Sequence, residues 1–256
     1  MKVAVLVKQT FTTEARIVLD GAGGIDGSKV KKIVNPYDEF AVEEAVQLKE
    51  KGAVESISVF CVGPESAAEA LRQCLAMGAD EATLIDDAGI DGVDASQPAA
   101  VLAAAIREGG FDLLLAGYVA VDDNAAQTAV RVAEILGIPQ INVVSKLELG
   151  RGEVTAWREA DGVTEVVTAP LPALVTADKS LNRPRYPTLP NIMKAKKKPL
   201  VTKTPADYGI TVEAPKVKTV QVSLPPPKTG AKILDGTPAE SAKALVRALR
   251  DEAKVV

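Results

Sequence analysis

The chain has 256 residues, of which 47% are hydrophobic, 25% are charged and only 4% are aromatic, and its formal net charge is −4. This composition is typical of a soluble globular protein with one large domain or a domain plus an extension, and it argues against a nucleic-acid binder. The chain has no histidine and two cysteines. It therefore lacks the residues for a Ser–His–Asp or Cys–His mechanism, a disulfide framework or a four-ligand zinc site.

The compartment is indicated by the start of the chain and by its cysteines. Met1 leads directly into a strand-like run without a signal-peptide pattern, and no apolar run reaches the roughly 18 residues of a membrane span. Cys61 and Cys74 both fall in apolar patterns and are expected to be buried thiols. We expect a reducing setting without membrane insertion, either a bacterial cytoplasm or, for a processed eukaryotic form, the mitochondrial matrix.

Up to about residue 137, apolar runs typical of buried strands alternate with amphipathic patterns typical of helices. A small excursion is expected at 16–20 and 30–34, around the glycine-rich turn at 21–27. The predicted strands are 3–7, 56–62, 81–85 and 112–116, and the predicted helices are 36–51, 66–77, 97–108 and 123–136. This alternation predicts an α/β fold with a parallel, doubly wound sheet.

The second half of the chain has a different pattern. Strands are predicted at 142–149, 153–158, 165–168 and 173–177, either as extensions of the sheet or as a flanking hairpin. Residues 199–236 contain six prolines and little alternation, so this segment is expected to be disordered or to lie extended along another subunit. Residues 238–253 have an amphipathic pattern and predict a final helix that docks on something, because so short a helix is marginal alone.

Ligands of doubly wound sheets bind at the carboxyl ends of the strands. Four segments are predicted to meet there, at residues 7–9, 35–38, 62–64 and 117–128. The last is a small-residue turn before a helix, which suits a phosphate at the positive end of the helix dipole. Alternatively, Asp122 and Asp123 are plain helix N-caps.

Phosphoryl-transfer motifs are absent, since neither GxxxxGK[ST] nor a GxGxxG after the first strand is present. A bound nucleotide is therefore expected to be held and not hydrolysed. The carboxylates Glu43 and Glu44 are assigned to a polar helix face without catalysis. Residues 157–159 lie in a strand pattern, and the favoured interpretation is a cross-strand charge pair.

The segment NRPRYPTLPNIMKAKKK at 182–198 is typical of a surface that contacts another molecule. Its prolines stiffen an extended stalk, and Leu189, Ile192 and Met193 have the spacing of one helical face. A cluster of lysines follows at once. The alternative is a helix that docks on the core and carries a solvated lysine end.

These motifs identify a family. The chain resembles the β subunits of electron transfer flavoproteins from end to end, and the segment at 177–198 is the most specific part of the match. The motifs that carry the resemblance are VKQ at 7–9, NPYDEFAVEEAVQLKE at 35–50, LRQCLAMGAD at 71–80, the 117–128 turn with AEILGIPQ at 133–140, and ADKSLNRPRYPTLPNIMKAKKK at 177–198.

The resemblance implies a Rossmann-like domain related to the Usp-like adenine-nucleotide-binding fold, an extended C-terminal arm and a terminal helix. It implies a heterodimer with an α subunit that holds most of one redox-active FAD, and a structural AMP in this chain. Electrons would come from acyl-CoA dehydrogenases and pass to an acceptor such as ETF:quinone oxidoreductase. The AMP-contacting positions it implies are Leu6, Asn35, Pro36, Tyr37, Asp38, Val62, Gly117, Ala120, Val121, Asp122, Asp123, Asn124, Ala125, Ala126, Gln127 and Thr128.

Other residue roles come from the same resemblance. Tyr37 and Thr13 match positions near the flavin, and Glu159 matches an acidic residue that biases the swing of the flavin domain. Leu189 matches a leucine that anchors the partner dehydrogenase. The remaining docking positions are Pro190, Ile192, Met193, Lys194, Lys196, Lys197 and Lys198.

The implied organisation is a nucleotide-binding domain at 1–183, a recognition segment at 184–199 and an arm with a helix at 200–256 that wraps the α subunit. The chain departs from the family pattern at Ala126, Thr13 and Tyr118-Val119, which bears on single AMP and flavin contacts. Two alternatives stay open: a flavin-bifurcating β subunit with a second FAD in place of AMP, and a stand-alone Usp-like protein that binds ATP or AMP.

Overall fold

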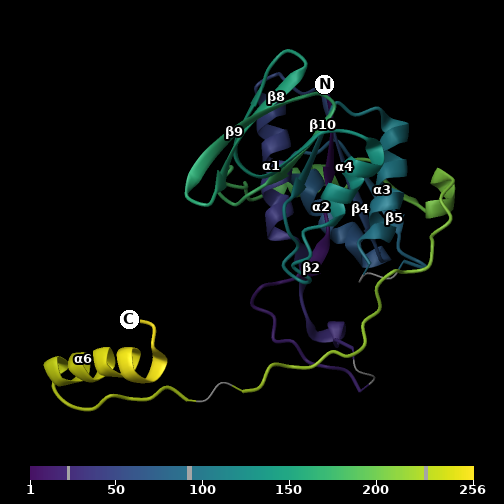
Figure 1. Cartoon of the computed structure of the whole chain (residues 1–256). Helices are drawn as coiled ribbons and strands as arrows, with labels where there is room; N and C mark the ends of the chain where they lie inside the picture. The colour runs from purple at the N-terminus through teal and green to yellow at the C-terminus, as the bar shows by residue number, and fades with distance from the viewer. Residues whose placement is uncertain (22–23, 91–93, 228–229) are drawn as a thin grey trace. The chain divides into compact units, whose positions relative to one another are not determined.

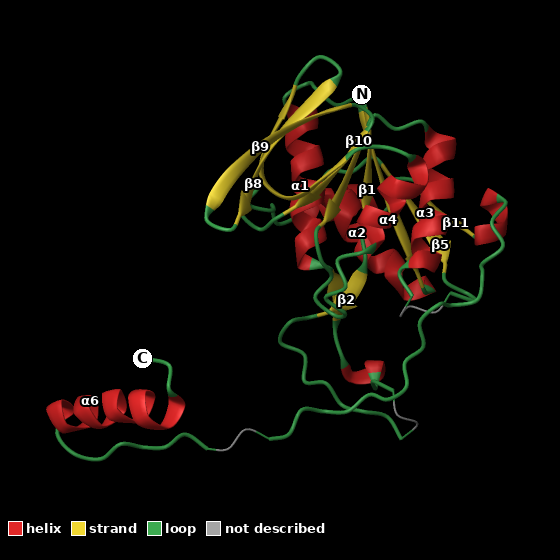
Figure 2. Cartoon of the chain, viewed as in Figure 1, coloured by secondary structure: helices red, strands yellow, loops and turns green. Residues whose placement is uncertain are grey.

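The structure is a computed structural model that describes residues 1–21, 24–90, 94–227 and 230–256. The described chain divides into two compact units, Met1–Gln221 and Val222–Val256. The first unit contains the central sheet and its flanking helices (Figures 1 and 2).

Nine strands form one sheet among the described residues, in the order β11-β5-β4-β1-β6-β10-β7-β8-β9. Every pair from β11 to β7 is parallel, and β8 and β9 continue the sheet as an antiparallel hairpin. The predicted parallel, doubly wound sheet is confirmed. The strands are β1 (Lys2–Leu6), β4 (Ser56–Gly63), β5 (Glu81–Asp86), β6 (Leu113–Gly117), β7 (Gln140–Leu149), β8 (Glu153–Ala160), β9 (Val163–Pro170), β10 (Ala173–Ala177) and β11 (Leu200–Lys203).

Helices cover both faces of the sheet. Helices α1 (Pro36–Glu50) and α2 (Ala68–Met77) pack on one face, and α3 (Ser96–Gly109) and α4 (Thr128–Leu136) pack on the other (Figure 1). Alternate residues of β1 serve the two cores: Val3 and Val5 join the first, and Ala4 and Leu6 join the second. Because the central strands are buried on both faces, their sequences are continuously apolar. Cys61 and Cys74 are buried thiols, as predicted.

Two predicted helices differ from the structure at their starts. The helix predicted at 66–77 starts as a single 3-10 turn, Glu65–Ala67, before α2. The helix predicted at 123–136 begins only at Thr128, so its predicted start is wrong. The backbone φ is +52° at both Asn124 and Ala126, a conformation that a right-handed helix cannot contain. The excursion after β1 forms a small antiparallel pair, β2 (Gln9–Phe11) with β3 (Lys32–Val34), while residues 16–20 contribute only an isolated bridge.

The proline-rich segment starts as part of the first unit, which its composition did not predict. Strand β11 pairs with β5 at the edge of the sheet, and the carbonyl of Pro199 accepts a 3.1 Å hydrogen bond from the amide of Ala82. A 3-10 turn at Pro205–Tyr208 follows. Further on, the carbonyl of Glu213 accepts a hydrogen bond from the Gln97 side chain, and Asp94 accepts one from the amide of Lys216. The segment is therefore fixed to its own domain as far as residue 216.

The second unit contains the predicted final helix. Helix α6 (Pro238–Arg247) continues as a π-helical turn, Ala248–Ala253. Its start is fixed by a capping box, in which Thr237 and Glu240 each bind the other's backbone amide. Leu245 and Val246, on the predicted apolar face, are about half exposed.

The stalk at 182–188 is attached to α1 by buried carboxylates. Glu43 and Glu44 are buried, so their assignment to a polar helix face is wrong. The guanidinium of Arg185 binds both carboxylate oxygens of Glu43 at 2.8 and 3.0 Å and also binds Glu50. Asn182 donates to Glu44 and to the carbonyl of Phe40, both at 3.0 Å. These contacts fix the direction in which the stalk leaves the domain.

We expect Glu43→Gln to lower the free energy of unfolding at pH 7 by about 1–3 kcal/mol, because the partly exposed guanidinium of Arg185 loses its buried charge partner. Burial raises the pKa of Glu43, but hydrogen bonds from Arg185 and Gln47 outweigh it and the pKa is lowered. A lowered pKa means that this contribution is present above pH 4.5 and is lost as the pH falls. Urea unfolding from pH 3 to pH 8 measures the difference, with the exposed Glu69→Gln on α2 as control. A deficit that is constant with pH would contradict the ionic contact.

Candidate functional site

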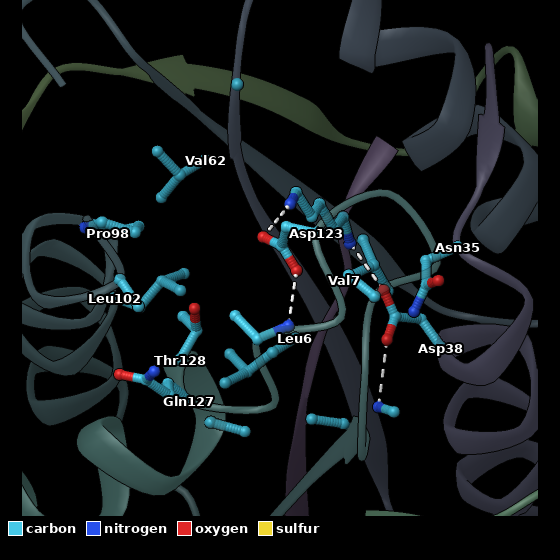
Figure 3. Close-up of a pocket in the computed structure, with 18 of the residues that line it drawn as sticks. Leu6, Val7, Asn35, Asp38, Val62, Pro98, Leu102, Asp123, Gln127 and Thr128 are labelled. Atoms are coloured by element: carbon cyan, nitrogen blue, oxygen red, sulfur yellow. Dashed lines mark hydrogen bonds and ion pairs between the residues drawn. The ribbon is translucent and has the colours of Figure 1, made fainter. Parts of the chain in front are cut away.

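A cavity of about 250 Å³ opens at the carboxyl ends of the parallel strands. The four segments predicted to meet at this edge of the sheet all line it, and the start of α3 completes the wall. Figure 3 shows Val62, Pro98 and Leu102 on one side and Asn35 and Asp38 on the other. The predicted convergence is therefore confirmed.

Asp38 and Asn35 join three segments that are distant in sequence. One carboxylate oxygen of Asp38 accepts from the amide of Lys8 at 2.7 Å, and the other accepts from the amide of Gly117 at 3.0 Å. Asn35 donates to the carbonyl of Val119 at 2.9 Å and accepts from the amide of Val121 at 3.2 Å. The start of α1 is thus bound to the ends of β1 and β6, and these bonds set the shape of the cavity (Figure 3).

The end of β6 packs tightly against the start of α1 at Gly117. A β-carbon added at Gly117 would lie 2.7 Å from the carbonyl carbon of Tyr37, so only glycine allows β6 to approach α1 this closely. Burial raises the pKa of Asp38 to about 7, although the amides of Lys8 and Gly117 and the Asn35 side chain favour the charged form. Desolvation of the carboxylate is therefore the larger effect.

Lys8 holds the loop that precedes α4. Its ammonium group lies 2.9 Å from a carboxylate oxygen of Asp122 and 2.8 Å from one of Asp123. Burial lowers the pKa of Lys8, but these two carboxylates outweigh it and the pKa is raised. The second oxygen of Asp123 accepts from the amide of Ala125. The alternative that Asp122 and Asp123 are helix N-caps is wrong, because α4 begins at Thr128 and their carboxylates bind Lys8.

The cavity has an apolar wall and a polar end. Leu6, Val62 and Leu102 form part of the wall, while Gln127 and Thr128 stand at the start of α4 (Figure 3). The first amides of a helix have no partner within that helix and favour an anion. An apolar wall for a planar base beside such a helix start suits a nucleotide.

Most of the residues predicted to contact the nucleotide line this cavity. They are Leu6, Asn35, Asp38, Val62, Gly117, Ala120, Asp123, Ala125, Ala126, Gln127 and Thr128. Pro36, Tyr37, Val121, Asp122 and Asn124 lie outside the lining. Among these, Asp122 contributes indirectly, through its ion pair with Lys8.

Sequence reasoning missed the contribution of the region after β5. Ile90, Pro98 and Leu102 line the cavity, together with Asp87 and Ala95. The signal was available in principle, because β5 ends at the same edge of the sheet as β1, β4 and β6. The sequence pattern in this region predicts only a helix at 97–108, and that helix is given no part in the predicted site.

The recognition segment forms a short helix with its apolar residues outside. Helix α5 (Leu189–Ala195) exposes Leu189 by 72%, Met193 by 56% and Ile192 by 42% of their surfaces. Only Ala195 within it is buried. Lys194, Lys196 and Lys197 are exposed too. Lys198 differs, because its ammonium group donates to the carbonyls of Leu75 and Ala79.

The other singled-out residues lie away from the cavity wall. Thr13 is exposed in a turn after β2. Tyr37 packs edge-on against Tyr118, with ring centroids 4.7 Å apart. Glu159 is exposed on β8 and accepts a hydrogen bond from Thr164 at 2.9 Å. Beside it, Arg158 pairs with Glu165 across β8 and β9 at 3.4 Å, which confirms the predicted cross-strand charge pair.

The described residues contain neither a candidate metal-binding cluster nor a candidate membrane-spanning helix. They contain no group of three or more His, Cys, Asp or Glu side chains arranged to hold a metal ion. None of their helices has the length and apolar character needed to cross a bilayer.

A doubly wound sheet with a cavity at the carboxyl ends of its strands defines the class of Rossmann-like α/β proteins. Residues 23–208 match the family described as the electron transfer flavoprotein domain. The chain belongs to the electron transfer flavoprotein family.

The full-length relatives are β subunits of that family. The chain is 46% identical over 259 residues to the electron transfer flavoprotein subunit beta of Bacillus subtilis, with 100% of both chains covered. It is 43% identical to the subunit beta of Syntrophomonas wolfei, covering 100% of this chain and 98% of the relative. For the human subunit beta the identity is 37%, and the coverage is 100% and 99%.

The raised pKa of Asp38 predicts a pH dependence. Asp38 stabilises the fold most below the pKa of the unfolded chain, near 3.8, and this contribution is lost as the pH rises toward 7. We expect the difference in unfolding free energy between the natural chain and Asp38→Asn to fall between pH 4 and pH 7 and to be constant above. Urea unfolding measures it, and carbon-13 NMR of the Asp38 carboxyl gives the midpoint directly. A difference that grows with pH would mean that the two amides hold Asp38 ionised.

Proposed function

We propose that this chain is the β subunit of a heterodimeric electron carrier. Its α subunit holds most of one FAD, which supplies the redox chemistry when it is bound. Electrons enter from dehydrogenases, including the acyl-CoA dehydrogenases of fatty acid β-oxidation, and leave to an acceptor such as ETF:quinone oxidoreductase. Full-length similarity to β subunits supports this proposal. The chain itself contributes a scaffold, a nucleotide site and a docking surface, without bond-making chemistry of its own.

The nucleotide site would hold AMP as a structural ligand. The apolar wall formed by Val62, Pro98 and Leu102 fits the adenine, and the amides at the start of α4, with Gln127 and Thr128, fit the phosphate. The walls of this site are held in place by Lys8, Asn35 and Asp38. These three residues would have no part in electron transfer. A second FAD in this cavity, as in a flavin-bifurcating subunit, is the alternative.

Residues outside the cavity would act on the flavin. Tyr37, backed by Tyr118, presents an aromatic edge near the end of β6, and we assign it to the flavin side of the subunit with Thr13. Exposed Glu159 is proposed to bias the swing of the flavin domain through its charge.

The observation that carries the docking role is the exposed apolar face of α5. Exposure of apolar side chains to water is unfavourable, and this face exposes Leu189, Ile192 and Met193. Apolar patches on protein surfaces often mark sites of interaction with another molecule. A single leucine in a desolvated pocket of the partner is a typical binding hot spot, and the adjacent lysines would speed encounter with an acidic surface.

The nucleotide content of the co-purified heterodimer tests the proposal. Acid release and chromatography should give one FAD and one AMP per heterodimer. Two FAD molecules would identify the bifurcating alternative. A chain that is stable alone, binds no flavin-bearing partner and hydrolyses ATP would instead be the stand-alone Usp-like protein.

We expect Leu189→Ala to slow reduction of the heterodimer by an acyl-CoA dehydrogenase, because truncating a buried anchor typically costs about 2 kcal/mol or more. Flavin and AMP content should be unchanged, since Leu189 lies on the surface away from the cavity. The matched control is Ile135→Ala, an exposed aliphatic residue on α4, on the opposite face of the sheet. Stopped-flow kinetics at several dehydrogenase concentrations measure the effect, and equal rates for both variants would refute the docking role.

A further inference from the structure

Helix α5 is held against α2 without burial of Leu189, Ile192 or Met193, which stay exposed. It has seven residues, too few to be stable in water alone, and Ala195 is its single buried residue. Hydrophobic burial within α5 is therefore limited to one small side chain. Polar contacts at the C-terminal end of the helix add to it.

The C-terminal end of α5 is bound to α2 by two reciprocal cations. The guanidinium of Arg72, on α2, donates to the carbonyl of Ala195 at 2.7 Å and to that of Lys198 at 2.8 Å. In return, the ammonium group of Lys198 donates to the carbonyls of Leu75 and Ala79 at the end of α2, at 3.0 and 2.5 Å. Each cation thus binds carbonyls at the negative end of the other helix.

The neighbouring chain is fixed on both sides of this contact. Before α5, Arg185 is bound to Glu43 and Glu50 on α1. After it, β11 is bound to β5 as an edge strand of the sheet. The chain on each side of α5 is therefore attached to the domain, at Arg185 before the helix and at β11 after it. Thr188 is the N-cap of α5.

From this geometry we infer that Arg72 and Lys198 are positioning residues, which hold α5 in its binding conformation before the partner arrives. The inference rests on the proposed docking function of α5. Because Lys198 is bound to α2, it is not available to contact the partner. The lysines that would contact the partner are Lys194, Lys196 and Lys197. The partner gains affinity because it does not have to order the helix on binding.

Arg72 and the exposed lysines would act by different physical routes. An exposed lysine attracts an acidic partner through solvent, and salt screens that attraction. The clamp formed by Arg72 and Lys198 acts through hydrogen bonds within the chain, so its effect should persist at high salt. Both bonds come from one terminal guanidinium nitrogen of Arg72, which lies farther along the side chain than a lysine ammonium group reaches, so Arg72→Lys should not restore the contact.

The test uses the flavin-loaded heterodimer with Arg72→Gln, Arg72→Lys and Lys198→Gln. The matched control is Arg107→Gln, which removes the same charge and a similar bond to a carbonyl, that of Ile135 between α3 and α4. Lys197→Gln serves as the control for an exposed charge. Amide hydrogen exchange of residues 189–195 is measured first, without any partner.

We expect faster exchange at 189–195 in all three clamp variants, and unchanged exchange there in both controls. With a substrate-reduced acyl-CoA dehydrogenase, Arg72→Gln should lower the second-order rate about tenfold at both low and 0.5 M salt. Lys197→Gln should lower the rate only at low salt. Flavin content and the thermal midpoint of the heterodimer show that each variant is assembled.

A double-mutant cycle separates positioning from general damage. If Arg72 acts by placing Leu189, then Arg72→Gln should change the rate less than twofold in a Leu189→Ala background. An equal factor in both backgrounds, or unchanged exchange at 189–195, would overturn the inference while leaving the docking function intact. A Leu189→Ala variant with natural kinetics would refute the docking function, and the exchange result would still decide whether the clamp orders α5.

Discussion

Asp38 accepts one hydrogen bond from the end of β1 and one from the end of β6, and the rest of the site depends on this contact. Both donors are backbone amides, so their position follows from the sheet and not from a side-chain rotamer. Replacement of water by these amides does not fully compensate the buried carboxylate, whose pKa remains raised. The same contact, which is unfavourable for the ionised carboxylate, closes one side of the cavity.

Helix α1 links the two functional regions of the chain. Its first turn carries Asp38, and its later turns carry Glu43, Glu44 and Glu50, which hold the stalk of the recognition segment. Three of these carboxylates, Asp38, Glu43 and Glu44, are buried, which is unusual for one helix because each requires a partner. Here the partners are distant in sequence, and each pairing fixes one functional segment to the same rigid element.

The chain distributes its apolar residues between stability and binding. The two cores on either side of the sheet contain the buried aliphatic side chains, whereas α5 presents Leu189, Ile192 and Met193 to solvent. A surface helix normally buries such a face to gain stability. In α5 polar contacts from Arg72 and Lys198 replace that burial, which leaves the apolar face available to a partner.

The sequence by itself determined the doubly wound sheet, the family and the edge of the sheet at which the cavity lies. Hydrophobic periodicity and turn residues are local signals, and they specify which segments form strands and helices. Only the tertiary structure decided that α4 starts at Thr128, that Glu43 and Glu44 are buried, that Lys198 binds α2 and that residues 200–203 join the sheet. Each of these depends on a partner far away in the chain, such as Lys8 for Asp123 or Arg185 for Glu43, and a linear pattern of polar residues does not reveal which of them will meet.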